Sequence, residues 1–356
     1  MRWVLLGDGR SPHLLKWARA LAPHVELWAA SSRDFDPGFD AVISPSRRLA
    51  LNTQPRFEGG NAGLLWQLPR LHSWLRTVSP DWIHAHYLTS HGTLAWLARR
   101  LGVRSRLVGS AWGTDILVTP ERGMLWRWVT QRILKDCVLT TSDSQHMAQL
   151  MRDLGAAQVM VFPFGLDVMP QALQQTDKDA NLVFANRGLE DIYDPLRVIE
   201  VFAQWAQGQP ALRLVVANDG ALRKQMQQQV AASDLVDRVE FVGRLDAQTQ
   251  SDYYRRAAWY MSLPRSDSVS VSLLEALAHG CVPIVSDLAA NREWVQADQT
   301  GVILPAGHYV QPQQVASLWA RWPQVYEHHR RSVSENAMFA PAVSRFLGVL
   351  AQHSSA

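Results

Sequence analysis

The sequence predicts an α/β protein built from two doubly wound domains, and three observations support this fold class. The chain has 356 residues, a length that divides naturally between two domains of ordinary size. Strand-like and helix-like patterns alternate in both halves, as they do in parallel sheets with helices on both faces. Residues 168–180 are polar and have no apolar period, which predicts a linker between the halves.

The first predicted domain, residues 1–167, alternates short apolar runs with amphipathic stretches. The apolar runs predict strands at 2–6, 25–29, 81–85, 106–109, 138–141 and 159–162. The amphipathic stretches predict helices at 11–21, 65–78, 92–101, 124–135 and 144–154.

The second predicted domain, residues 181–340, repeats the theme. Strands are expected at 181–185, 212–217 and 281–286, a helix at 195–207, and a short apolar helix that stops at Gly280. Residues 341–356 predict a tail or helix that packs back on the N-terminal domain. Because doubly wound sheets bind ligands outside the carboxyl ends of their strands, the two domains are expected to face each other across a cleft.

The composition is typical of a soluble globular protein, with 47% apolar and 19% charged residues. No apolar run reaches the length of about 18 residues that a membrane span needs. Cys137 and Cys281 lie in apolar settings and are expected to be buried free thiols, which favours a cytoplasmic location.

The charge is unevenly distributed, with +6 over residues 1–167 and −3 over residues 168–356. This difference favours contact of the first half with an anionic surface or acceptor, although ordinary surface variation explains it equally well. The segment 122–135 is basic, aromatic and helical in period. It is expected either to lie on the anionic inner face of a membrane, making the protein peripheral there, or to be a core-packed helix with basic solvent positions.

The first strand ends in a glycine turn that leads into a helix start at Ser11 and Pro12. Gly9 lets a ligand approach the backbone there, or serves only a tight turn. Pro12 stands where the dinucleotide pattern needs its third glycine, so no nicotinamide cofactor is expected.

Two histidines end the strand at 81–85 and point to one face of it, His84 and His86. No carboxylate or third histidine follows at a suitable spacing, so no metal site is expected. A hydrogen bond from His86 to a substrate is favoured over a purely structural role. Asp115 follows the next strand and either faces the same cleft or forms a turn.

The stretch 266–280 is the most informative in the chain, because Asp267 and Glu275 bracket a serine-rich loop that leads into a helix. Free amides and the positive end of the helix dipole bind phosphate at such a place. The alternative is a capping box formed by Ser272 and Glu275, which needs no ligand. Arg187 stands at another strand end, where a guanidinium suits bidentate phosphate contact.

Taken together, these motifs resemble the retaining nucleotide-sugar glycosyltransferases of family 4, which have the GT-B fold of two Rossmann-like domains. The resemblance covers nearly the whole chain. Its motifs lie at 11–13, 84–87, 110–115, 141–144, 162–167, 187–189, 218–220, 239–243 and 273–280.

The resemblance implies roles for individual residues. The catalytic residues would be His86, which would reach the donor sugar from the other domain, together with Arg187 and Asp267. The nucleotide-sugar donor would be held by Arg187, by Gly243 and Arg244 along the base, by Ser270, Val271 and Ser272 at the distal phosphate, and by Glu275 at the ribose. The acceptor side would contain Gly9, Ser11, His13 and Asp115.

Two positions depart from the family pattern. Asp267 replaces the usual glutamate, and Ile192 stands where the family pairs its arginine with a lysine. The implied activity is transfer of a hexosyl group to a hydroxyl of a glycan or lipid-linked acceptor in polysaccharide or glycoconjugate biosynthesis. It would need no metal, no cofactor beyond the donor and no nucleic-acid partner. The alternative is a weakly active nucleotide-sugar-binding or regulatory protein on the same scaffold.

Overall fold

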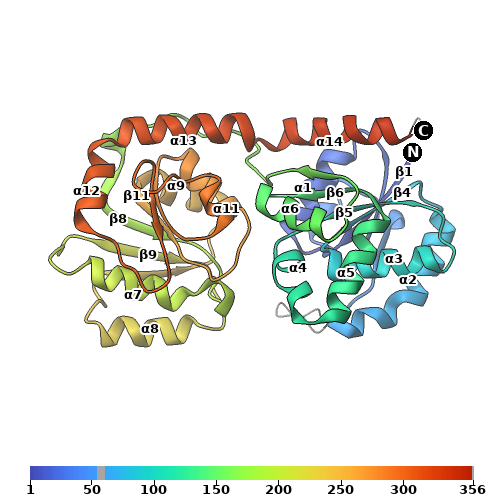
Figure 1. Ribbon diagram of the computed structural model, residues 1–356, viewed down its shortest axis with the longest axis horizontal. Helices are drawn as coiled ribbons and strands as arrows, with labels where there is room; N and C mark the ends of the chain where they lie inside the picture. Colours follow the sequence, from blue (N-terminus) through green and yellow to red (C-terminus); the bar gives the residue numbers. More distant parts are fainter. Residues whose placement is uncertain (54–60, 355–356) are drawn as a thin grey trace. The chain divides into compact units, whose positions relative to one another are not determined.

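The computed structural model describes residues 1–53 and 61–354, which form two compact units (Figure 1). Unit 1 contains Met1–Phe162 and Val343–Ala356, and unit 2 contains Pro163–Ala342. This division falls before the predicted boundary at residue 167, and the segment predicted as a linker belongs to unit 2. The last residues of the chain belong to unit 1.

Unit 1 is built on a parallel sheet of seven strands in the order β3-β2-β1-β4-β5-β6-β7. The strands are β1 Arg2–Gly7, β2 Glu26–Ser31, β3 Arg48–Ala50, β4 Trp82–His86, β5 Arg106–Ser110, β6 Cys137–Ser142 and β7 Val159–Val161. The helices are α1 Pro12–Leu21, α2 Leu68–Val78, α3 Thr93–Arg100, α4 Thr114–Leu117, α5 Met124–Asp136, α6 Gln145–Asp153 and α14 Phe339–Ser354, which begins in unit 2. Shorter turns are η1 Pro37–Phe39, η2 Pro45–Arg47, η3 Asn61–Gln67, the π-helical η4 Leu88–Gly92 and η5 Thr119–Arg122.

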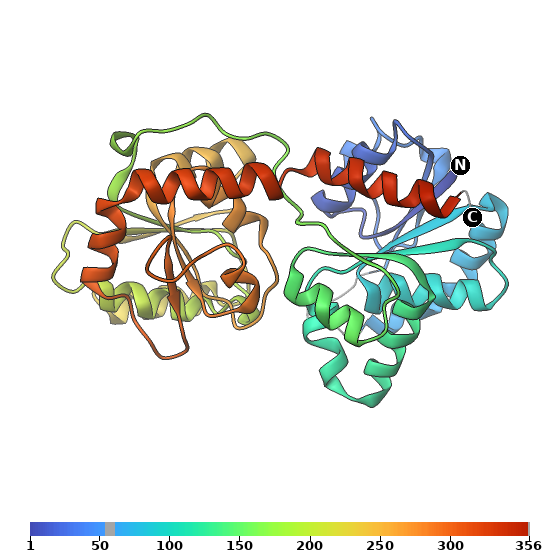
Figure 2. The same ribbon diagram turned by 45° about the horizontal axis from the view of Figure 1, so that its top comes forward.

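The two faces of this sheet differ in chemistry. The face covered by α2, α3 and α5 is aliphatic and includes Ile83 and Ala85 of β4. The opposite face of the same strand carries His84 and His86, because side chains alternate along a strand. There Phe346 of α14 stacks on His84, with ring centroids 5.4 Å apart. In both views the start of β1 and the end of α14 lie close together (Figure 2).

Unit 2 is built on a parallel sheet of six strands in the order β10-β9-β8-β11-β12-β13. The strands are β8 Asp179–Ala185, β9 Arg213–Ala217, β10 Val239–Gly243, β11 Ala257–Ser262, β12 Val282–Ser286 and β13 Val302–Leu304. The helices are α7 Pro195–Trp205, α8 Arg223–Ala232, α9 Ala247–Arg256, α10 Val271–Ala278, α11 Ala289–Arg292, α12 Pro312–Ala320 and α13 Trp322–Asn336, with short turns η6 Gln175–Asp177 and η7 Asp191–Tyr193.

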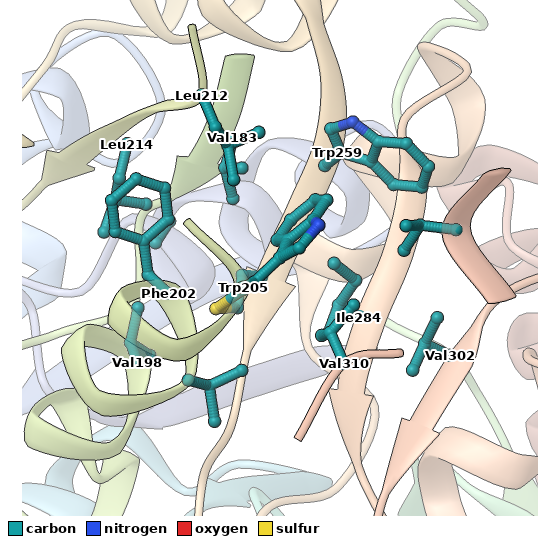
Figure 3. Packing of buried hydrophobic residues seen from close by; sticks show 14 of the residues in the cluster. Val183, Val198, Phe202, Trp205, Leu212, Leu214, Trp259, Ile284, Val302 and Val310 are labelled. Atoms are coloured by element: carbon teal, nitrogen blue, oxygen red, sulfur yellow. The ribbon is translucent and has the colours of Figure 1, made fainter. Parts of the chain in front are cut away.

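The core of unit 2 is filled by large side chains from both layers (Figure 3). Phe202 and Trp205 of α7 point toward Leu214 of β9 and Trp259 of β11. The two indole rings meet edge to face at 5.4 Å, an arrangement that aromatic quadrupoles favour. This packing fixes the strands whose carboxyl ends carry the predicted site.

The sequence-based expectations for individual elements agree well with the structure. All the strands and helices predicted in the first half are present, with ends shifted by a few residues. The short edge strand Arg48–Ala50 was not predicted. Cys137 and Cys281 are buried free thiols, as expected. Among residues 1–53 and 61–354, no helix has the length and apolar character that a bilayer crossing requires.

Candidate donor-binding site

The predicted donor-binding residues of unit 2 lie at the carboxyl ends of neighbouring strands. Arg187 follows β8, Asp267 follows β11, and these two strands pair in parallel. Because the carboxyl ends of parallel strands lie at the same sheet edge, the two loops meet. The helix α10 begins in the second of these loops and continues the site.

Ser270 is the N-cap of α10, and its hydroxyl oxygen accepts a hydrogen bond from the amide of Leu273 at 3.1 Å. The capping box of Ser272 and Glu275, the alternative interpretation of this stretch, is therefore not formed. The helix starts earlier, so Ser272 is already its second residue. The Glu275 carboxylate accepts instead from the side-chain amide of Gln250 at 3.0 Å. Ser270 engages the amides of Leu273 and Leu274, so the amides left for an anion at the helix start are those of Val271 and Ser272.

Arg187 and Asp267 form an ion pair, with Nη2 and Oδ2 2.6 Å apart and side chains 19% and 20% exposed. The guanidinium also lies over the ring of Tyr193, 4.4 Å from its centroid. Burial raises the pKa of Asp267, and the positive charge of Arg187 opposes that rise. Burial alone would lower the pKa of Arg187, but Asp267 and nearby tyrosines more than offset it, so Arg187 remains a cation.

A buried hydrogen-bond chain joins the end of β8 to the start of α10. The side-chain amide of Asn186 donates to the hydroxyl of Tyr254 at 2.7 Å, and that hydroxyl donates to the carbonyl of Ser272 at 3.1 Å. Close to this chain, Asn186 Oδ1, Arg187 Nε and Tyr260 Oη are buried without a hydrogen-bond partner. Unpaired buried polar atoms are uncommon, and here they lie where the predicted site needs groups for a ligand.

Gly243 and Arg244, assigned by resemblance to the nucleotide base, lie where β10 ends. Gly243 has φ +73°, a conformation that favours glycine, and its carbonyl accepts from the Asn218 amide at 2.6 Å. Arg244 is exposed. The helix α9 follows directly and supplies Gln250, so the segment also contacts the Glu275 end of α10.

His86 of unit 1 is 4% exposed, and both of its ring nitrogens lack a hydrogen-bond partner. Burial, with smaller contributions from His84, His91 and His13, lowers its pKa well below the ordinary value, so the ring is neutral. Its neighbour His84 contacts the hydroxyl of Ser110 at 2.7 Å, and burial lowers the pKa of His84 to about 3. Both ring nitrogens of His86 are therefore available for a hydrogen bond, whereas one ring nitrogen of His84 is already engaged. Within the described residues, no group of three or more His, Cys, Asp or Glu side chains is arranged to hold a metal ion.

The predicted acceptor-side residues do not all behave alike. The Gly9 amide donates to the hydroxyl of Ser31 at 2.7 Å, and a Cβ on Gly9 would lie 2.5 Å from the carbonyl oxygen of Asp34. The structure thus favours the tight-turn interpretation for Gly9. Ser11 precedes α1 without a side-chain capping bond and is partly exposed. His13 packs its ring 4.9 Å from that of Trp112.

Asp115 is fully buried, which favours the turn interpretation over contact with an acceptor. Its oxygens accept from the amides of Leu88 at 2.8 Å and Trp112 at 2.9 Å. Burial raises its pKa to about 6 despite these bonds. Asp115 therefore ties together the loops that follow β4 and β5. Trp112, which was not assigned a role, packs between His13 and His86, with ring centroids 4.9 and 5.8 Å away.

Family models match both units. The model described as glycosyl transferase 4-like matches residues 3–144, and the model described as glycosyl transferases group 1 matches residues 167–337. Two Rossmann-like domains of this kind define the GT-B fold. The chain belongs to the family of group 1 glycosyl transferases, of the 4-like type.

Solved structures share this fold over almost the entire chain. Sucrose-phosphate synthase from Thermosynechococcus elongatus is similar with a TM-score of 0.80 at 18% identity, covering 100% of this chain and 99% of that one. HepE from Anabaena in complex with UDP is similar with a TM-score of 0.74 at 15% identity, covering 99% and 100%. Identities this low establish the fold alone.

A curated relative is alpha-monoglucosyldiacylglycerol synthase from Streptococcus pneumoniae. It is 24% identical over 297 residues, which are 76% of this chain. The match spans 59% of the length of that relative.

Proposed function

We propose that this protein transfers a hexosyl group from a nucleoside-diphosphate sugar to a hydroxyl of a glycan or lipid-linked acceptor, with retention of the anomeric configuration. The observation that carries the proposal is the Arg187–Asp267 pair beside the free amides of α10, in a chain of this family. A guanidinium and a helix N-terminus together recognise a diphosphate.

The chemistry follows from this arrangement. The bond between the anomeric carbon and the diphosphate oxygen breaks as the acceptor oxygen attacks from the side on which the diphosphate leaves. The acceptor proton passes to the departing diphosphate oxygen, so no protein nucleophile, metal or further cofactor is required. Arg187 and the α10 amides stabilise the charge that develops on the leaving group. Glu275 holds the ribose, and the assignments of Asp267 and His86 to the donor sugar stay predictions.

The donor is best identified by thermal shift and calorimetry with a panel of nucleotide sugars, starting with UDP and UDP-glucose. UDP comes first because HepE was solved with it. The glucosyl group comes first because the curated relative is named alpha-monoglucosyldiacylglycerol synthase. Formation of a glycosylated acceptor separates an enzyme from the alternative, a regulatory protein that only binds nucleotide sugars.

Variants of Arg187 test the site assignment. Arg187→Ala should weaken UDP binding by about tenfold or more, because a hydrogen bond to a charged group is worth about 1.5–3 kcal/mol. Arg187→Lys keeps a positive charge beside Asp267. It is therefore the matched control for the effect of leaving Asp267 without a counter-charge in Arg187→Ala. Normal UDP affinity in Arg187→Ala would contradict the assignment of Arg187 to the donor diphosphate.

We also propose that unit 1 contacts an anionic membrane through the start of α5, consistent with a lipid-linked acceptor. The core-facing side of this helix is formed by Thr130, Ile133 and Leu134, which are buried. Yet Met124 and Leu125 are 90% and 68% exposed, which core packing does not account for.

Further aromatic and basic side chains accompany these two residues. Trp126 and Trp128 are 44% and 45% exposed, and Arg132 lies 5.4 Å from the centre of the Trp128 ring. Exposed aliphatic residues at one helix end, with tryptophans and arginines behind them, are typical of helices that bind an anionic lipid interface. The protein would then be peripheral to the membrane.

Vesicle co-sedimentation tests this contact. Wild-type protein should sediment with vesicles that contain phosphatidylglycerol and not with pure phosphatidylcholine. Met124→Ser combined with Leu125→Ser should release it. Val236→Ser removes an exposed apolar residue from unit 2 and should bind like wild type. Equal binding by the double variant would overturn the proposed contact.

A further inference from the structure

A second arginine, Arg265, joins the same two loops as the Arg187–Asp267 pair but in the opposite chain direction. Arg187 lies in the loop after β8 and reaches Asp267 in the loop after β11. Arg265 lies in the loop after β11 and reaches back to Asp191 and Asp194 in the loop after β8. The first pair is largely buried, and the second set is more exposed.

The contacts of Arg265 are extensive for a surface residue. Its Nη1 lies 2.9 Å from Asp191 Oδ2, and its Nε lies 3.0 Å from Asp194 Oδ2. Its backbone amide also donates to the carbonyl of Ile192 at 3.0 Å. Isolated surface ion pairs contribute little, but a guanidinium shared by two carboxylates and fixed by a backbone bond forms a network.

The conformation of Asp194 indicates that this contact is not incidental. Asp194 stands at the N-cap of α7, where an aspartate normally accepts a hydrogen bond from the first helical turn. Here it makes no capping bond, and its φ is +45°, which is strained for a residue with a side chain. Its carboxylate is directed to Arg265 instead. A lost cap and a strained backbone at one residue point to a function for the contact.

Ile192 lies in the middle of the clamped segment, at the position where the family resemblance places a lysine. Its carbonyl, between the two aspartates, accepts a hydrogen bond from the Arg265 amide. The neighbouring Tyr193 carries the ring over which Arg187 lies at 4.4 Å. The position of Arg187 is therefore connected to Arg265 through four consecutive residues, 191–194.

We propose that Arg265 is a positioning residue for the donor site. It clamps the loop that carries Arg187 and Tyr193 against the loop that carries Asp267 and the start of α10, so that the guanidinium and the helix amides converge on one diphosphate. This proposal rests on the proposed donor-binding function. The guanidinium of Arg265 is paired with two aspartates, so Arg265 does not act as the missing lysine.

The test compares Arg265→Gln with Arg265→Lys and with Arg255→Gln, using UDP and the donor identified by the nucleotide-sugar panel. Arg255 is an exposed arginine of α9 and controls for the loss of one positive charge from unit 2. Arg265→Gln should weaken UDP binding and raise the donor KM by about tenfold, as a small misplacement of binding groups does. Arg265→Lys should recover part of this loss, and Arg255→Gln should bind like wild type.

The melting temperature separates positioning from stability. A change in melting temperature with unchanged UDP affinity and donor KM in Arg265→Gln would overturn the proposal, since a merely structural clamp gives that result. UDP binding that falls equally in Arg255→Gln and Arg265→Gln would also overturn it, because net charge would then explain the effect. Wild-type protein that binds none of the nucleoside diphosphates would overturn the proposed function as well.

Discussion

Asp267→Asn is the substitution whose outcome follows most directly from the geometry of the donor site. The asparagine keeps the size of the side chain and removes its charge. In the structure that charge neutralises Arg187 at 2.6 Å. A diphosphate must therefore share Arg187 with Asp267 and approach a carboxylate of its own sign. We predict that Asp267→Asn binds UDP more tightly than wild type while it transfers sugar more slowly.

The magnitude can be worked from Coulomb's law. Two unit charges about 6 Å apart at an effective dielectric constant of about 20 repel by roughly 2–3 kcal/mol. Both side chains retain about a fifth of their exposure. Solvent and salt therefore reduce the effect to roughly 1–2 kcal/mol, which corresponds to a 5- to 30-fold gain in affinity.

The pH dependence provides a second signature of the same group. Burial raises the pKa of Asp267, so protonation on acidification also frees Arg187. UDP binding by wild type should tighten as the pH falls toward this raised pKa. Among the other titratable groups near the pair, Tyr193, Tyr254 and Tyr260 have pKa values raised by burial and stay neutral over this range. Burial also raises the pKa of Glu190, which contributes to the pH profile of both proteins. The diphosphate titrates too, and the profile of Asp267→Asn corrects for it.

The assay is calorimetric titration of UDP into both proteins at neutral and mildly acidic pH, with product formation measured separately. Tighter binding at neutral pH and a flatter pH profile in the variant are the expected results. Equal or weaker binding by Asp267→Asn at neutral pH would refute the competition between Asp267 and the diphosphate.

Three further predictions test other parts of the structure. Glu275→Ala should raise the donor KM by about tenfold through loss of the ribose contact, whereas Gln250→Ala, which removes only the partner of that carboxylate, should have a smaller effect. Ile192→Lys should tighten UDP binding if the site lacks a cation, and calorimetry showing unchanged affinity would mean that another cation compensates. Phe346→Ala should destabilise unit 1 by about 3–5 kcal/mol because the ring is fully buried; an unchanged midpoint for unit 1 in denaturant unfolding followed by hydrogen exchange would contradict this.

Periodicity in the sequence was sufficient for the architecture but not for the details of the site. Apolar runs and amphipathic stretches predicted the strands and helices because burial follows these periods directly. The alternative of a capping box at Ser272 was plausible because Ser270 and Ser272 are both suitable caps, and only the backbone shows that Ser270 is used. The three residues of β3 contain no apolar run, so no pattern predicted that strand.

Contacts between distant residues were beyond the reach of the sequence. The partners of Arg265 lie some seventy positions earlier in the chain, and the local pattern of neither segment predicts the contact. The burial of Asp115 could not be predicted either, because a turn and a ligand site use the same residue types. Exposure of Met124 and Leu125 depends on which side of α5 meets the core, and a helical period alone does not decide that.

The assignment of Val343–Ala356 to unit 1 has a consequence for how the nascent chain folds. Unit 2 is continuous in sequence and can close its core while the segment that follows Ala342 is still inside the ribosome. Unit 1, although most of it is synthesised first, receives Phe346 against Trp17 and His84 only after unit 2 has been translated. Until then, Phe346 does not cover the face of unit 1 that carries Trp17 and His84. A fragment cut at residue 162 would lack that ring, and a self-sufficient N-terminal unit would have to carry the C-terminal segment in cis or receive it as a separate peptide.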